Sequence, residues 1–234
     1  MLISAIQKFT LLDYPGKLAG VVFTPGCNFH CGYCHNPEFV DSEKIEKIRS
    51  SFIPEQIFFN FLEKRRRLLD GIVITGGEPT IMYDLTTFIR KIKTFGLAVK
   101  LDTNGSNPEK LKNLLAEKLL DYIAMDIKTA PDHYPEVAGP LSQFQAVADS
   151  ISIIENSGVP YEFRSTIVKE LHSREILEKM ADLISGSERF YLQTFRPQNT
   201  LDEKFSSYHS YTAEEMNNLA KEIFASRVKY VGVR

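Results

Sequence analysis

Short apolar runs alternate with longer amphipathic segments along most of the chain. The short runs are rich in β-branched residues and predict strands, whereas the longer segments repeat apolar positions at helical spacing and predict helices. We predict strands over residues 17–24, 71–75, 97–103, 122–128, 161–168, 189–195 and 229–233, and helices over residues 54–69, 83–95, 108–117, 140–156, 173–184 and 213–226. Residues 2–9 predict an extra strand that turns back near Pro15-Gly16.

Alternating strands and helices favour an α/β fold with a parallel sheet. Six strand–helix units and a terminal strand are fewer than the eight units that close a TIM barrel. We therefore expect an open, partial (βα)6 TIM-like barrel whose active site lies at the C-terminal strand ends. A doubly wound open sheet is the alternative, because the sequence does not determine strand order. No linker or shift in composition interrupts the chain, so we expect a single domain over residues 1–234.

Composition narrows the range of partners. The chain is 43% hydrophobic and 25% charged with a net charge of −2, so nothing in it predicts binding to nucleic acid or to an anionic membrane. No apolar run approaches the ~20 residues of a membrane span. The first residues do not resemble a signal peptide, and the chain has three cysteines, an odd number. We expect a cytoplasmic protein whose thiols stay reduced.

The three cysteines lie together, at Cys27, Cys31 and Cys34, with the spacing C-x3-C-x2-C. A disulfide framework favours an even number of cysteines and a secreted protein. A structural zinc site needs four ligands, and His30 or His35 would have to supply the fourth. Three thiolates fit best with a cubane iron–sulfur cluster that leaves one iron open to another ligand.

Polar residues gather at the ends of the predicted strands. They form the segments Gly76-Gly77-Glu78-Pro79, Asp102-Thr103-Asn104-Gly105 and Asp126-Ile127-Lys128, with Arg164 on the fifth strand and Arg196 after the sixth. Because side chains alternate along a strand, Asp126 and Lys128 share a face opposite Ile127. Parallel α/β sheets place their active sites at this edge, so we expect these residues to surround the cysteine loop.

The cysteine spacing, with Tyr33 directly before the last cysteine, resembles the signature of radical S-adenosylmethionine enzymes. The wider run from Asp13 through Phe23-Thr24-Pro25-Gly26-Cys27 to Glu38 resembles the glycyl-radical activating branch, and most closely its anaerobic ribonucleoside-triphosphate reductase activating proteins. This resemblance implies a 4Fe–4S cluster on Cys27, Cys31 and Cys34. It also implies that S-adenosylmethionine chelates the open iron beside Cys34 and His35, with Tyr33 against the adenine.

The resemblance extends to the strand ends. It implies that the backbone of Gly76-Gly77-Glu78 meets the cofactor amino group, that Asp126 and Lys128 contact its methionine end, and that Arg164 reaches its carboxylate or ribose. It also implies that Asp102 and Asn104 line the same cofactor site, and that Asp102, Thr103 and Asp126 form a small monovalent cation site. Arg196 follows Phe195 where pyruvate formate-lyase activating enzymes carry a histidine, and this departure argues against a strict formate-lyase activator.

The resemblance implies that the protein cleaves S-adenosylmethionine reductively and generates a glycyl radical on a partner enzyme. The partner that the resemblance favours is anaerobic ribonucleotide reductase. A flavodoxin or ferredoxin would supply the electron. The alternatives are activation of pyruvate formate-lyase, a radical enzyme for a small molecule such as a 7-deazaguanine synthase, and a zinc-binding interaction protein. His133, His172 and His209 show no ligand-like spacing and predict surface or capping positions. The sequence leaves the partner, the electron donor and the oligomeric state open.

Overall fold

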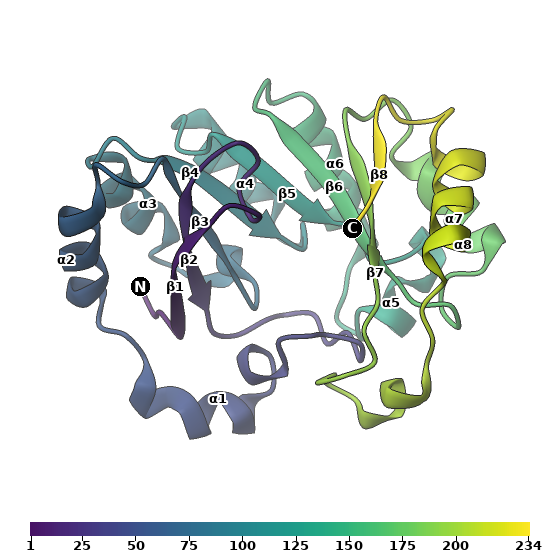
Figure 1. Ribbon diagram of the computed structural model, residues 1–234, viewed down its shortest axis with the longest axis horizontal. Coiled ribbons are helices and arrows are strands. Elements are labelled where there is room, and N and C mark those ends of the chain that lie inside the picture. The colour runs from purple at the N-terminus through teal and green to yellow at the C-terminus, as the bar shows by residue number, and fades with distance from the viewer.

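The computed structural model describes all residues, 1–234, and contains one eight-stranded sheet whose order follows the chain, β1 to β8 (Figure 1). The strands are β1 (Ala5–Thr10), β2 (Ala19–Thr24), β3 (Gly71–Gly76), β4 (Ala98–Thr103), β5 (Tyr122–Asp126), β6 (Tyr161–Ile167), β7 (Phe190–Thr194) and β8 (Val231–Val233). β1 pairs antiparallel with β2, and every later pair is parallel. β8 does not pair with β1 or β2, so the barrel is open, which confirms the predicted fold.

The helices connect successive strands, as expected of strand–helix units. They are α1 (Ser42–Ile48), α2 (Glu55–Arg65), α3 (Leu85–Lys93), α4 (Pro108–Ala116), α5 (Tyr134–Val137), α6 (Phe144–Glu155), α7 (Arg174–Leu183) and α8 (Ala213–Leu219), which continues as a π turn over Ala220–Phe224. The short helices α1 and α5 were not predicted from the sequence. None of these helices has the length and apolar character that a membrane crossing requires.

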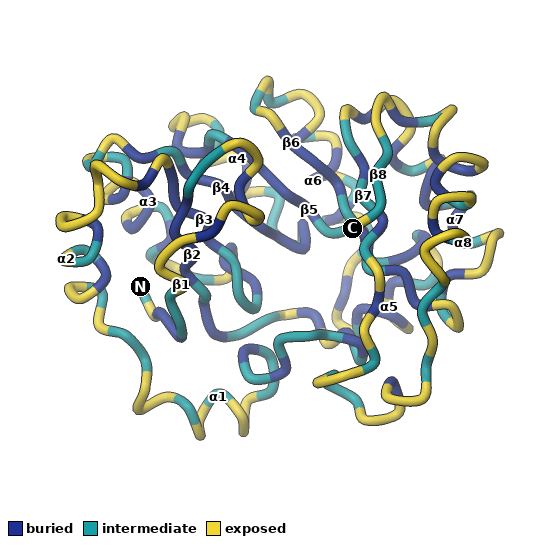
Figure 2. The backbone as a smooth tube through the Cα atoms, viewed as in Figure 1, coloured by how far each residue is buried: buried dark blue, intermediate teal, exposed yellow.

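The main core lies between the sheet and the helices that cover its outer side, and Figure 2 shows the strands buried while the helices expose one face. β5 illustrates how the sequence pattern produces this arrangement. Ile123, Met125 and Ile127 are fully buried in the main core, whereas Asp126 and Lys128 line a cavity on the other side. The predicted alternation of faces along this strand is therefore confirmed.

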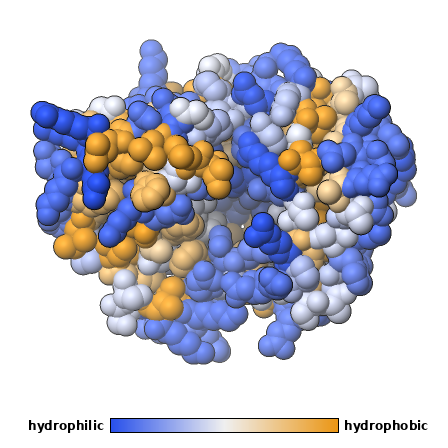
Figure 3. Space-filling model, viewed as in Figure 1, coloured by the Kyte–Doolittle hydropathy of each residue, from blue (hydrophilic) through white to orange (hydrophobic).

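The hairpin that joins β1 to β2 presents the most exposed apolar side chains of the N-terminal region. Phe9, Leu11 and Leu12 are 68%, 73% and 89% exposed, and a hydrophobic area lies over this turn in Figure 3. The turn lies at the start of β2, whereas the cysteines follow the end of β2. This surface is consequently at the opposite end of the sheet from the predicted site.

Candidate active site

A cavity of about 520 Å³ opens at the C-terminal ends of the parallel strands. Figure 3 shows this side of the molecule hollowed near its centre, with hydrophilic side chains around the hollow. Every residue that the sequence assigned to the site lines this cavity: Cys27, Cys31, Tyr33, Cys34, His35, Gly76, Gly77, Glu78, Asp102, Thr103, Asn104, Asp126, Lys128, Arg164 and Arg196. Its volume lies within the range of about 300–1,000 Å³ that is usual for small-molecule sites.

Sequence reasoning missed part of the lining. The additional residues are Phe29, Asn36, Val40, Thr75, Thr166, Gln193, Thr194 and Arg234. The last of these pairs with the buried Glu162 through two hydrogen bonds of 2.9 and 3.0 Å, and its guanidinium lies 3.4 Å from the centre of the Tyr191 ring. The order of β6, β7 and β8 brings Thr166, Gln193, Thr194 and Arg234 to the cavity, so no local motif signals these four, whereas Phe29 and Asn36 lie within or beside the cysteine loop itself.

Glycines hold the cysteine loop against the end of β3. The Gly77 amide donates to Thr24 O at 2.9 Å, and the Glu78 amide donates to Gly26 O at 2.7 Å. A Cβ at Gly77 would lie 1.9 Å from the Gly26 carbonyl oxygen, and one at Gly76, whose φ is +120°, would lie 2.3 Å from Thr24 N. The two glycines are therefore required for close backbone packing.

A second segment covers the cysteine loop from the C-terminal half of the chain. The Asp202 amide donates to Gly32 O at 2.9 Å, and a Cβ at Gly32 would lie 2.3 Å from the Phe205 ring. Phe205 also meets Tyr33 edge-on, with ring centres 6.1 Å apart. The turn Glu203–Ser207 thus packs directly on the loop and limits its contact with solvent.

The three thiols are shielded to different degrees. Cys31 is buried, and Cys27 and Cys34 are half-buried. Burial raises the pKa of Cys27 to about 12 and that of Cys31 to about 11, and it also raises the pKa of Cys34. Without a metal these groups remain protonated thiols near neutral pH, so a metal cluster must displace their protons when it binds.

The cysteines are not arranged for one small metal ion. No three His, Cys, Asp or Glu side chains come together closely enough to hold a single ion. A tetrahedral zinc needs four ligand atoms within about 2.3 Å of one point, whereas each cysteine of a cubane cluster binds a different iron. The three thiolates of the C-x3-C-x2-C loop therefore suit a cluster with one open iron better than a four-ligand zinc knuckle.

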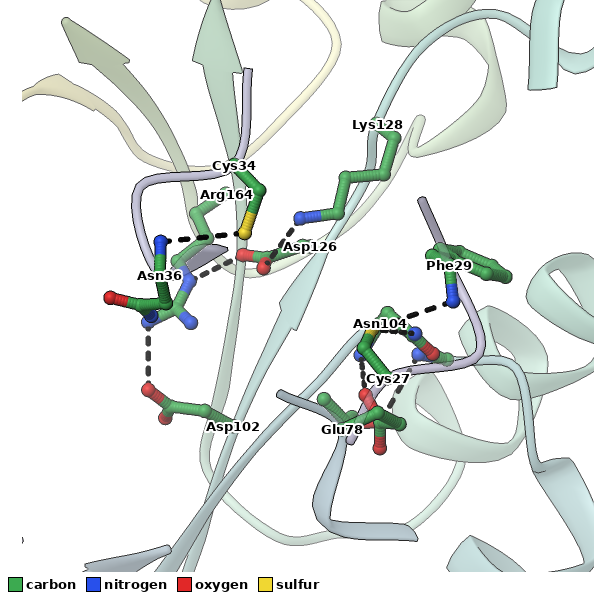
Figure 4. A network of polar contacts seen from close by, with 12 residues as sticks. Cys27, Phe29, Cys34, Asn36, Glu78, Asp102, Asn104, Asp126, Lys128 and Arg164 are labelled. Atoms are coloured by element: carbon green, nitrogen blue, oxygen red, sulfur yellow. Dashed lines mark hydrogen bonds and ion pairs between the residues drawn. The ribbon is translucent and has the colours of Figure 1, made fainter. Parts of the chain in front are cut away.

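An alternating ion network forms another part of the cavity wall, and Figure 4 draws Arg164, Asp126 and Lys128 near Cys34. Arg164 contacts Asp102 at 3.1 Å and Asp126 at 2.5 Å, Lys128 contacts Asp126 at 2.9 Å, and Lys100 pairs with Asp102. The members of the network that line the cavity, Arg164, Lys128, Asp102 and Asp126, balance in charge, and Lys100 pairs with Asp102 from behind the wall. Arg164 and Lys128 have further N–H donors, which suit the carboxylate of a ligand.

The network also determines the charge states of its carboxylates. Burial alone would raise the pKa of Asp102, but Arg164 and Lys100 outweigh it and the net pKa is lowered. Arg164 and Lys128 have the same effect on the pKa of Asp126. The carboxylates already bind side-chain cations, and the Thr103 hydroxyl donates to Glu78 at 2.8 Å. The geometry therefore gives no independent support to the expected monovalent cation site.

Two further observations test whether the cavity fits a bound cofactor. Tyr33 is 3% exposed, lines the cavity and has a buried hydroxyl without a hydrogen-bond partner, so a ligand with a polar group would satisfy it. Arg196 is exposed at the cavity and has no ion-pair partner. His35 lies beside it, and burial, reinforced by Arg196, lowers the pKa of that histidine. The residues present fit a polar cofactor that carries a carboxylate beside the cysteine loop.

The prediction for one histidine was wrong. His172 is fully buried, not at the surface: its Nδ1 lies 2.9 Å from Val168 N and accepts its hydrogen, while its Nε2 lies 2.9 Å from Lys128 O. The hydrogen bond to Lys128 O joins the segment before α7 to the end of β5, so His172 holds the Lys128 backbone in place. His209, by contrast, is exposed and pairs with Glu170 at 2.7 Å, as expected of a surface position.

Comparison with known proteins agrees with this geometry. Residues 21–184 match the model of the Radical SAM superfamily, so fold and site together define a radical S-adenosylmethionine enzyme. A protein of Methanocaldococcus jannaschii, named "Putative glycyl-radical enzyme activating enzyme", is 34% identical over 94% of this chain and 90% of its own length. The pyruvate formate-lyase-activating enzyme of Clostridium pasteurianum is 28% identical over 85% of this chain and 82% of its own length. The chain belongs to the glycyl-radical enzyme activating branch of the radical SAM superfamily.

The fold is also found in solved structures. The Streptococcus suis protein SuiB, bound to its precursor peptide SuiA, superimposes with a TM-score of 0.65 at 14% identity over 92% of this chain. The chain spans about half of the SuiB chain, 48% of its length. This similarity shows the fold alone. Membership of the family implies a 4Fe–4S cluster and S-adenosylmethionine.

Proposed function

We propose that this protein generates a glycyl radical on anaerobic ribonucleotide reductase. The observation that carries the proposal is the convergence of three cysteines, a Gly-Gly-Glu turn and a network of alternating ion pairs on one open cavity. Because the barrel does not close, a polypeptide segment has lateral access to the cavity. The other support is the resemblance of the cysteine-loop sequence to activators of that reductase.

In this proposal Cys27, Cys31 and Cys34 hold the cluster. Arg164 and Lys128 bind the carboxylate of the methionine moiety, because both line the cavity and have N–H donors beyond those that pair with Asp102 and Asp126. Tyr33 lies against the adenine, and its unpartnered hydroxyl takes a hydrogen bond. The backbone of Gly76 and Gly77 approaches the amino group, since no Cβ intervenes.

The cluster, when bound, would supply the one electron needed for reductive cleavage of S-adenosylmethionine, with methionine and 5′-deoxyadenosine as products once a hydrogen atom has been taken from the partner's glycine Cα. The protein's own contribution is binding, orientation and exclusion of water. Asp102 and Asp126 hold Arg164 in place through ion pairs. The Phe205 segment covers the loop. No side chain has to act as a general base or a nucleophile.

We further propose that an external flavodoxin or ferredoxin delivers the electron, since the chain has no cysteines for a second cluster. The protein would work in the reducing cytoplasm as a single domain of residues 1–234. It would not bind nucleic acid. The monovalent cation site near Asp102, Thr103 and Asp126 stays a secondary proposal, in which a cation would have to compete with Arg164.

The experiment that tests the proposed target uses a panel of partners. The anaerobically reconstituted protein is reduced and incubated with S-adenosylmethionine and, separately, with anaerobic ribonucleotide reductase or pyruvate formate-lyase. We expect a glycyl EPR doublet with the reductase, and no doublet when its radical-site glycine is replaced by alanine. A doublet with pyruvate formate-lyase alone would show that pyruvate formate-lyase, and not the reductase, is the target. Turnover of a 7-deazaguanine precursor without any doublet would overturn the activating function.

A further inference from the structure

Asn104 lies directly beyond β4 with its side chain between the cysteine loop and the following turn (Figure 4). The orientation of its amide follows from its partners. The Ser106 backbone amide donates to Asn104 Oδ1 at 2.9 Å, so the oxygen must face that turn. The Nδ2 group then faces the cysteine loop, 3.1 Å from Asn28 Oδ1 and 3.8 Å from Cys27 Sγ.

The buried carboxylate of Glu78 fixes this position. Glu78 is fully buried and accepts a hydrogen bond of 2.6 Å from the Asn104 backbone amide and one of 2.8 Å from the Thr103 hydroxyl. The amide and the hydroxyl of Thr80 donate to the same carboxylate at 2.9 and 2.6 Å. Glu78 thus clamps the ends of β3 and β4 together. Its side chain is occupied by protein donors, so its part in the site is to hold Asn104.

The hydrogen bonds to the cysteine sulfurs differ in kind. Cys27 Sγ accepts from the Phe29 backbone amide at 3.4 Å, and Cys34 Sγ accepts from the Asn36 backbone amide at 3.5 Å. Asn104 is the one side chain that donates to any of these sulfurs. Cys27 therefore has two donors, of which a substitution can remove one without changing the loop backbone.

We propose that Asn104 is a positioning residue that acts through Cys27 and raises the reduction potential of the cluster held there. The inference rests on the proposed function, because it concerns the reduced cluster that this function requires. The added electron increases the negative charge on the cluster and its thiolates. A hydrogen-bond donor aimed at a ligating sulfur stabilises that charge, and such donors are among the features that determine cluster potentials.

The test compares Asn104→Leu with the wild-type protein after anaerobic reconstitution. The midpoint potential of the cluster is measured by EPR-monitored redox titration without S-adenosylmethionine, so the readout does not depend on turnover. We expect a lower midpoint for Asn104→Leu, and a tenfold change in the reduction equilibrium corresponds to 59 mV for one electron. Asn36→Ala is the matched control, since Cys34 keeps its backbone donor, and its midpoint should be unchanged.

Asn104→Asp provides a second variant of nearly the same shape, in case leucine prevents folding. It keeps the acceptor for the Ser106 amide but removes the donor to Cys27, so its midpoint should also fall. Wild-type midpoints in both Asn104 variants at full iron content would overturn the inference and leave the proposed function intact. A wild-type protein that assembles no cluster would overturn the proposed function itself.

Discussion

Gly77→Ala is expected to separate the cysteine loop from the sheet. The new Cβ would lie 1.9 Å from Gly26 O, 2.5 Å from Gly26 C and 2.8 Å from Phe39 O. All three are backbone atoms, so no side-chain rotation can relieve the contact. The loop must move, and that movement breaks the hydrogen bonds Gly77 N to Thr24 O and Glu78 N to Gly26 O.

The size of the effect follows from these two contributions. Overpacking costs about 1–3 kcal/mol. Each lost hydrogen bond contributes about 0.5–1.5 kcal/mol. Together they lower the free energy of unfolding by roughly 2–6 kcal/mol, a large part of the 5–15 kcal/mol that is typical of a domain. Because the displaced loop carries Cys27, iron binding should fall as well.

The assay is denaturant unfolding of the metal-free protein, followed by iron analysis after anaerobic reconstitution. Gly96→Ala is the matched control: its φ is +75° and a Cβ there meets nothing within 4 Å. It should cost only the left-handed strain of about 1–2 kcal/mol and keep full iron content. If Gly77→Ala is as stable as Gly96→Ala and binds as much iron, the account of the Gly-Gly turn is wrong.

Three further outcomes are expected. Arg164→Met leaves Asp126 with fewer partners and should lower the free energy of unfolding, measured with denaturant, by about 3–5 kcal/mol. It should also weaken binding of S-adenosylmethionine at least about tenfold in equilibrium titration. Unchanged stability and affinity would show that the ion network is not needed. Phe205→Ala should lower the free energy of unfolding by about 3–5 kcal/mol and should make the cluster absorbance decay faster in air. If the absorbance of this variant decays at the wild-type rate, Phe205 does not shield the cluster. His172 has a lowered pKa because of burial, so below its ordinary value of 6.5 the unfolded state binds a proton that the folded state does not. Stability should therefore fall as the pH drops below about 6.5, and His172→Gln should flatten this dependence relative to wild type.

The sequence predicted most of the fold because its strands are short, apolar and regularly spaced. The predicted strands 71–75 and 122–128 coincide with β3 and β5 to within two residues. The helices α1 and α5 escaped prediction for a physical reason. α1 has no buried residue and therefore no apolar periodicity, and α5 is a single turn of four residues. Short elements like these depend on tertiary contacts rather than on pattern.

The same distinction applies to the site. Local motifs identified Cys27, Glu78 and Asp126 because each lies in a recognisable strand-end segment. The partners of these residues could not be read from the sequence. The hydrogen bond from the Asn104 amide to Glu78 joins residues 26 positions apart, and the Arg234 pair with Glu162 joins residues 72 positions apart. The first contact joins the ends of the neighbouring strands β3 and β4, and the second spans β7, so both depend on the order of strands in the sheet.

The central claim is that three cysteines at one end of an open barrel hold a cluster that cleaves S-adenosylmethionine. The most direct measurement is metal content and 5′-deoxyadenosine formation after anaerobic reconstitution and reduction, in the wild-type protein and in Cys31→Ala. We expect about four irons per chain and 5′-deoxyadenosine in the wild-type protein, and neither in Cys31→Ala. One zinc per chain, with no iron and no 5′-deoxyadenosine in the wild-type protein, would contradict the account.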